Sequence, residues 1–110
     1  MDNAVDPITT TLVRHALDAA VARQAVHAHN IANANTPGYR AKAVSFQAAV
    51  DIEAARTQAP EPVLHDTHQP VNLASEVAAM AENSLQYQSL VRLLNRHLSI
   101  AAIALNDGRR

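Results

Sequence analysis

Residues 73–105 read LASEVAAMAENSLQYQSLVRLLNRHLSIAAIAL, and their apolar spacing decides the expected fold. Small and apolar side chains recur at alternating intervals of four and three residues for more than four heptads. This pattern is typical of a helix that buries one stripe in a coiled coil or a helical bundle. The positions of this heptad row are Leu73, Val77, Met80, Ser84, Tyr87, Val91, Leu94, Leu98, Ala101 and Leu105.

Local signals predict where this C-terminal helix begins and ends. Asn72 is a suitable capping residue, and the Asn-Asp-Gly sequence of residues 106–108 supplies a stop, so we predict a helix over residues 72–106. A second apolar row lies off the heptad row, which predicts more than one packing partner for the helix. This second row consists of Leu85, Leu93, Ile100 and Ile103.

The N-terminal part of the chain predicts a second long helix, over residues 7–35. Asp6 can cap this helix, and proline is well suited to the first helical position, which Pro7 occupies. No glycine or proline follows until Pro37, and alanine recurs throughout. Apolar side chains surround most of the helix, which predicts burial against several neighbours. The larger ones expected at such contacts are Leu12, Leu17, Val26 and Ile31.

The middle of the chain, residues 36–71, has weaker signals. We expect a turn, a possible short helix over residues 44–56, and a proline-rich extended linker over residues 57–70. The predicted fold is therefore all-α, a single domain over residues 1–110. In it the two long heptad helices pair as an α-helical hairpin or coiled coil, joined by an irregular middle segment.

The composition restricts the classes of function. Of 110 residues, 48% are hydrophobic but only 3% aromatic, and 23 are alanine, so the chain cannot build a thick core alone. An enzyme with a walled pocket is not expected. Two glycines are too few for a P-loop or Rossmann phosphate cradle, and the absence of cysteine excludes disulfides and thiolate chemistry. A net charge of −1 offers no basic face for nucleic acid.

The most specific stretch is residues 30–47, NIANANTPGYRAKAVSFQ. Asn30 and Asn33 share one face at the end of the first helix, where their amides can bond to terminal carbonyls or to a neighbouring chain. The Pro37-Gly38 pair suits the centre of a type II turn and ends the helix. Tyr39 follows as an amphipathic anchor.

This stretch resembles the N-terminal signature of the bacterial flagellar rod, hook and hook–filament junction proteins. The signature, N-x-x-N-x-x-T-P-G followed by Tyr or Phe, is filled here by Asn30, Asn33, Thr36, Pro37, Gly38 and Tyr39. The Ser45-Phe46 pair and residues 81–88, AENSLQYQ, are similar to the proximal-rod members of the family. The resemblance covers both helices, about 70 residues, and is weak over residues 57–70.

The resemblance implies a structural subunit of the flagellar basal-body rod that serves motility and is not an enzyme. Such proteins cross the flagellar type III export apparatus without a cleaved signal, and the N-terminus here lacks the features of a secretory signal peptide. The expected location is the periplasm-spanning rod of the basal body. Expected partners are copies of the chain, other rod proteins, and ring, adaptor and export-gate components. No cofactor, metal, small-molecule substrate or nucleic acid is expected.

Other hypotheses have less support in the residues. A cytosolic helical adaptor or export-chaperone-like dimer stays open, because heptads do not distinguish a dimer from a polymer. His65, Asp66 and His68 could be metal ligands, but a fourth ligand and a second shell are not evident. No serine lies on a strained glycine turn, which disfavours a nucleophile. The N-terminal helix lacks the cationic density of a membrane-surface helix.

Overall fold

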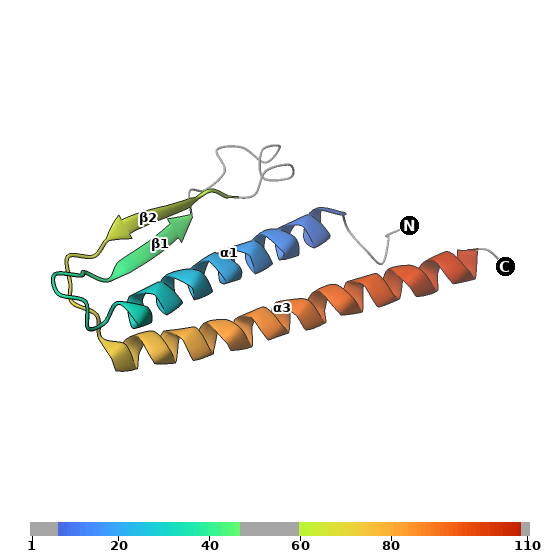
Figure 1. The fold of residues 1–110 in the computed structure, drawn as a ribbon. Coiled ribbons are helices and arrows are strands. Elements are labelled where there is room, and N and C mark those ends of the chain that lie inside the picture. Colours follow the sequence, from blue (N-terminus) through green and yellow to red (C-terminus); the bar gives the residue numbers. More distant parts are fainter. Residues whose placement is uncertain (1–6, 47–59, 109–110) are drawn as a thin grey trace.

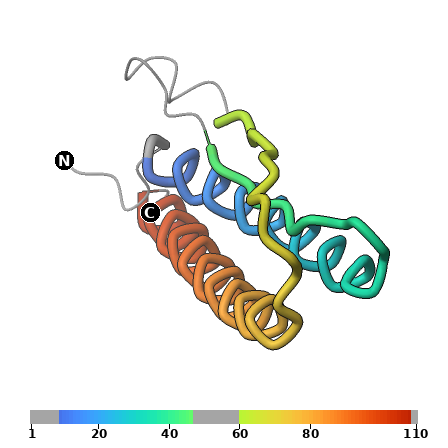
Figure 2. Tube along the Cα trace, turned by 90° about the vertical axis from the view of Figure 1, so that its left-hand side faces the viewer, coloured from blue at the N-terminus to red at the C-terminus, as the bar shows by residue number. Residues whose placement is uncertain are grey.

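The computed structural model describes residues 7–46 and 60–108, which form two long helices and a small sheet (Figure 1). Helix α1 spans Pro7–Ala32, strand β1 Lys42–Phe46, strand β2 Pro62–Asp66 and helix α3 Leu73–Gly108. The helices run antiparallel side by side, and the strands lie along α1 on the side away from α3 (Figures 1 and 2). The expected helical hairpin is confirmed, and the sheet is an addition to it.

Helix α1 ends at Ala32, three residues before the expected end at residue 35. The backbone N–H of Asn33 still donates to the carbonyl of His29 at 3.1 Å, and its side-chain Nδ2 donates to the same terminal carbonyl at 2.9 Å. The backbone N–H of Ala34 then donates to Ile31 three residues back, as in a tightened last turn. Asp6, the expected capping residue, lies outside the described residues.

Helix α3 is longer than α1 and extends beyond it. Asn72 caps it as expected, because its Oδ1 accepts a bond of 3.0 Å from the N–H of Ser75. The helix continues through Gly108, past the expected end at residue 106. Contacts of His27 with Glu76 and of Ala20 with Asn83 fix the antiparallel pairing. If this register continues, each step back along α1 is matched by one step forward along α3, and Pro7 lies near residue 96. Helix α1 therefore does not reach residues 98–108.

The expected short helix over residues 44–56 is wrong where the structure can test it. Residues 44–46 belong to strand β1, and the remainder lies outside the described residues. Strand β2, inside the expected linker, pairs antiparallel with β1 from Lys42 opposite Asp66 to Phe46 opposite Pro62. A five-residue segment such as KAVSF is too short for its spacing to distinguish helix from strand, and a partner strand about 20 residues away leaves no local signal.

The interior is as thin as the composition predicts. Among the described residues, the buried apolar side chains are those of Val13, Ala20 and Ala41, and the buried polar ones are Asn30 and Asn83. An amide, not a large hydrocarbon, is therefore the bulkiest fully buried group. Because two of the five buried residues are asparagines, polar contacts as well as apolar packing hold the described hairpin together.

Candidate assembly site

Asn30 lies at the junction of both helices and the sheet. Its side chain is 0% exposed. Its Nδ2 donates to the carbonyl of Lys42 at 2.8 Å and to Glu76 Oε1 at 3.1 Å. Its Oδ1 accepts from the Tyr39 hydroxyl at 2.7 Å and from the N–H of Lys42 at 2.9 Å. An amide has two donor hydrogens and two acceptor lone pairs, so every hydrogen-bonding capacity of this side chain is used.

Glu76 connects the same junction to helix α3. While its Oε1 accepts from Asn30, its Oε2 lies 2.7 Å from Nδ1 of His27. Both side chains are mostly buried, with 24% of His27 and 16% of Glu76 exposed. Hydrogen bonds to a carboxylate at such sites are stronger than those between neutral groups. Together Asn30, Tyr39, Lys42, Glu76 and His27 form a polar junction that links α1, the turn after it, β1 and α3.

The turn after α1 directs the chain into this junction. The backbone N–H of Thr36 donates to the carbonyl of Asn33, and the hydroxyl of Thr36 donates to the Asn33 side chain. The N–H of Tyr39 donates back to the Thr36 carbonyl at 3.2 Å, across Pro37 and Gly38. Gly38 has φ of 79°, as the third position of a type II turn requires. The Tyr39 ring then meets His29 edge to face at 5.7 Å.

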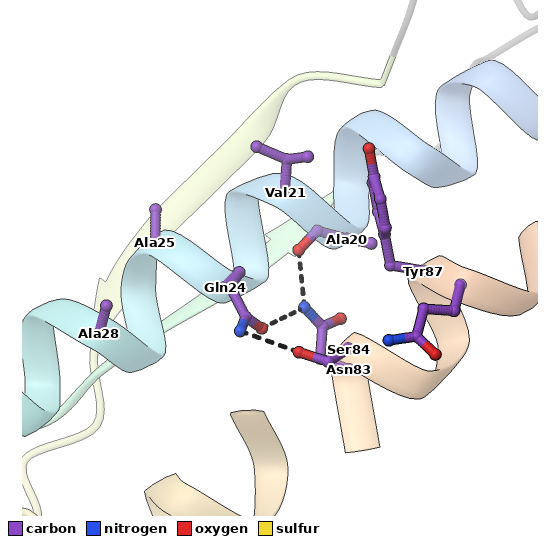
Figure 3. A pocket seen from close by; sticks show the side chains of 9 residues that line it. Ala20, Val21, Gln24, Ala25, Ala28, Asn83, Ser84 and Tyr87 are labelled. Carbon is purple, nitrogen blue, oxygen red and sulfur yellow. Dashed lines mark hydrogen bonds between the residues drawn. The ribbon is translucent and has the colours of Figure 1, made fainter. Parts of the chain in front are cut away.

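Asn83 forms a second polar contact, further along the helical pair. It is 4% exposed, and its Nδ2 donates to the Ala20 carbonyl at 2.7 Å and to Gln24 Oε1 at 2.8 Å. The Gln24 amide in turn donates to the Ser84 hydroxyl at 3.2 Å. The Oδ1 of Asn83 has no hydrogen-bond partner among the described residues. One acceptor is therefore left open next to α1 (Figure 3).

The predicted heptad row of α3 coincides only in part with the face that α1 covers. Ser84 of that row bonds to α1, but Glu76 and Asn83 beside the row do so as well, so the covered face is rotated from the row toward these polar residues. Members of the heptad row that are half-buried in the described structure are Met80, Ser84, Val91, Leu94 and Ala101. The exposed members are Leu73, Val77, Tyr87, Leu98 and Leu105.

The remaining predicted contact residues divide in the same way. On α1, Leu17, Val26 and Ile31 are half-buried, whereas Leu12 is exposed. The second apolar row of α3 is exposed along its whole length, at Leu85, Leu93, Ile100 and Ile103. These four side chains lie away from the face that bonds to α1. A large part of the apolar surface predicted to need partners is thus uncovered in the single chain.

The histidines and acidic groups of the described residues do not converge on one point. No group of three or more His, Asp or Glu side chains there could hold a metal ion. His68 has φ of 60°, and its N–H donates to Asp66 Oδ1 at 2.7 Å. This backbone bond is the main reason that the pKa of Asp66 lies below its ordinary value, with Lys42 as a lesser cause. Across the described ranges, neither helix is long and apolar enough to cross a membrane.

Several residues of the polar contacts were not predicted from the sequence. Glu76 and Asn83 are seven residues apart on α3, and this spacing of two polar residues beside a heptad row was a usable signal. Lys42 contributes only backbone groups to Asn30, which no side-chain pattern predicts. Arg23, whose guanidinium lies 5.0 Å from the centre of the Phe46 ring, also gave no sequence signal.

Comparison with known proteins shows which proteins this sequence resembles. The sequence model of a family described as flagella basal body rod protein matches residues 14–40, which include most of α1, Asn30 and the turn to Tyr39. The resemblance to the flagellar basal-body rod proteins is confirmed. Within that class, the chain is similar to flagellar basal body rod protein FlgB of Bacillus subtilis (strain 168). The two are 28% identical over an alignment 119 positions long, which covers 88% of this chain and 92% of the relative.

Proposed function

We propose that this protein is a structural subunit of the flagellar basal-body rod and acts by assembling with neighbouring subunits through the exposed faces of α1 and α3. The relative from Bacillus subtilis is described as a basal body rod protein and aligns with nearly the whole chain. The proposal is therefore of an architectural function, in which helices are positioned against other helices.

The uncovered second row of α3 is the observation that carries this proposal. Leu85, Leu93, Ile100 and Ile103 are exposed on a face that α1 does not contact. Complete burial of a fully exposed leucine or isoleucine is worth about 1.5–3 kcal/mol, and these side chains, 40–64% exposed, would gain about half of that each. A surface of this kind, repeated on many copies, supplies the free energy of packing that the thin interior of one chain lacks.

The location and partners follow from the same proposal. The subunit occupies the rod of the basal body and packs as concentric, coiled-coil-like layers of helices. Its partners are further copies, other rod proteins, and the ring, adaptor and export-gate components that the growing rod meets. It leaves the cytoplasm through the flagellar type III apparatus without a cleaved signal.

A charge on the exposed end of α3 tests the proposal. Leu98 is 47% exposed, so Leu98→Glu leaves the contacts between α1 and α3 largely intact while placing a carboxylate on the proposed packing surface. In a strain that lacks its own copy of the gene, we expect expression and export of the variant to persist and rod formation and motility to be lost. A buried unpaired charge costs far more than the few kcal/mol that one leucine contributes.

Asn95→Asp is the matched control, because it adds the same charge at an exposed position of α3 that belongs to neither apolar row. Motility with Leu98→Glu equal to that with Asn95→Asp would contradict the proposal. The alternative, a cytosolic adaptor dimer, predicts a different solution state. Circular dichroism of the isolated rod subunit should show helicity that rises with concentration, whereas a fully helical, cooperatively melting species at micromolar concentration would favour the adaptor.

A further inference from the structure

A groove runs between α1 and α3 on one side of the hairpin. It has a volume of about 420 Å³ and lies beside Asn83 (Figure 3). Its α1 wall consists of Val21, Gln24 and three alanines, and its α3 wall carries polar side chains and one aromatic ring. The lining residues are Ala20, Val21, Gln24, Ala25, Ala28, Asn83, Ser84, Tyr87 and Gln88.

Short side chains at i, i+4 and i+7 spacing make this wall suitable for another helix. Val21, Ala25 and Ala28 are exposed and follow one another along a single face of α1 (Figure 3). Alanines allow a neighbouring helix to approach closely, and larger side chains of that helix can occupy the spaces between them. The exposed Val77, seven residues before Ser84, extends the apolar surface along α3.

The open acceptor of Asn83 indicates what an occupant must carry. Both amide hydrogens of Asn83 are used, but its Oδ1 is buried without a partner among the described residues. A buried acceptor without a bond costs about 1–3 kcal/mol, which a donor from an incoming chain would recover. Because the Oδ1 atom is itself buried, side chains beside it would have to shift to admit that donor, and the exposed Gln88 is among those that line the groove.

The chain itself has a segment with the matching properties. Residues 98–108 of α3, here called the overhang, extend past the point that described α1 reaches. They expose Leu98, Ile100, Ile103 and Leu105, the last of them 65% exposed. Ser99 lies one turn before Ile103, so a hydroxyl donor accompanies two isoleucines on neighbouring faces. Large apolar groups and a donor on the overhang complement alanines and an acceptor in the groove.

We propose that the groove receives the overhang of a second copy of this chain, with a donor next to Ile103 bonding to Asn83 Oδ1. This inference rests on the proposed function, for which it names one subunit contact. The groove and the overhang are different patches on one molecule, so the contact is heterologous and each copy offers an unused groove and an unused overhang to the next. Such contacts build open, directional assemblies instead of closed dimers.

Disulfide trapping tests the contact directly, because the chain has no cysteine of its own. Full-length Ala25→Cys and Ile103→Cys chains are mixed under mild oxidation at concentrations where the protein associates. Both positions are exposed, so folding should be retained. We expect a mixed disulfide between the two variants, since docking brings the Cα atoms within about 4.4–6.8 Å. The control pair is Ala78→Cys with Ile103→Cys, because Ala78 is exposed on α3 outside the groove.

A second variant distinguishes docking from random collision. Adding Ala28→Leu to the Ala25→Cys chain fills the groove and should reduce the mixed disulfide by about tenfold or more. Equal yields from the groove and control pairs, or dominant linkage of Ile103→Cys to itself, would overturn the inference. If that occurs while Leu98→Glu still blocks rod formation, the proposed function stands and only this contact is wrong. If Leu98→Glu leaves motility intact and trapping succeeds, the chain associates as inferred but not as a rod subunit.

Discussion

Replacing Asn30 tests whether a polar side chain, and not apolar packing, holds the hairpin together. Asn30→Ala removes the bonds to the Tyr39 hydroxyl and to both backbone groups of Lys42, each neutral and worth about 0.5–1.5 kcal/mol net. It also removes the bond to Glu76, where a charged partner is worth about 1.5–3 kcal/mol. Summed, the four bonds correspond to about 3–7.5 kcal/mol.

Partial rehydration lowers this figure, because Tyr39 and Glu76 retain some exposure and can bond to water once the amide is gone. We therefore expect the free energy of unfolding to fall by about 3–4 kcal/mol, near the upper end for single substitutions. Urea titration followed by far-ultraviolet circular dichroism, at one fixed protein concentration, measures this change. The fixed concentration is needed because association stabilises the folded chain.

Two matched variants make the measurement decisive. Tyr39→Phe removes only one of the four bonds and should cost about 1 kcal/mol. Asn33→Ala removes an amide three residues away that serves the end of α1, with an expected loss of about 1 kcal/mol. If Asn30→Ala costs no more than Asn33→Ala, the polar junction does not hold the hairpin and the reasoning fails.

Two further predictions concern the turn and the loop. Gly38→Ala should lower the free energy of unfolding by about 1–2 kcal/mol, because φ is 79° there although a Cβ atom would meet nothing within 4 Å; a thermal melt that matches the parent would contradict this. The carboxyl of Asp66 should titrate below 3.8 in a carbon-13 NMR experiment, since the His68 N–H lowers its pKa. Because the pKa of Asp66 is lower in the folded chain, its ionised carboxylate stabilises the turn after β2 at pH values above the ordinary pKa of aspartate. This contribution is lost as the pH falls through the lowered pKa. Asp66→Asn should abolish the titration, and a midpoint at or above 3.8 would show that the bond is not formed in solution.

The lengths of the two helices could be predicted from the sequence because helix formation depends on local signals. Alanine content, the Asn72 cap and the heptad spacing all act within a few residues of one another. The rotation of α3 relative to α1 could not be predicted from apolar spacing, since Glu76 and Asn83 occupy the covered face. A polar side chain is accepted there only because its partners are positioned by the fold, and those partners lie 46 to 63 residues away.

In the candidate site, too, local bonds could be predicted and distant ones could not. The spacing of Asn30 and Asn33 singled out both residues, but the structure shows that they have different roles. Asn33 serves its own helix end, a local bond that the sequence allows one to expect. Asn30 bonds to a tyrosine, a strand backbone and a distant glutamate, so its role depends on where the chain returns. The sheet that brings Lys42 to it was not predicted for the same reason.

The spacing of the two polar contacts has a mechanical consequence. Glu76 and Asn83 are seven residues apart on α3, or about 10.5 Å along its axis, and both are held by α1. Alanine-rich surfaces alone would let one helix slide past the other with few steric obstacles. Here a shift of one helical turn, about 5.4 Å, would break the bonds at both positions at once. The two helices therefore resist sliding along each other, and this resistance to shear comes from hydrogen bonds that run across the helix axis.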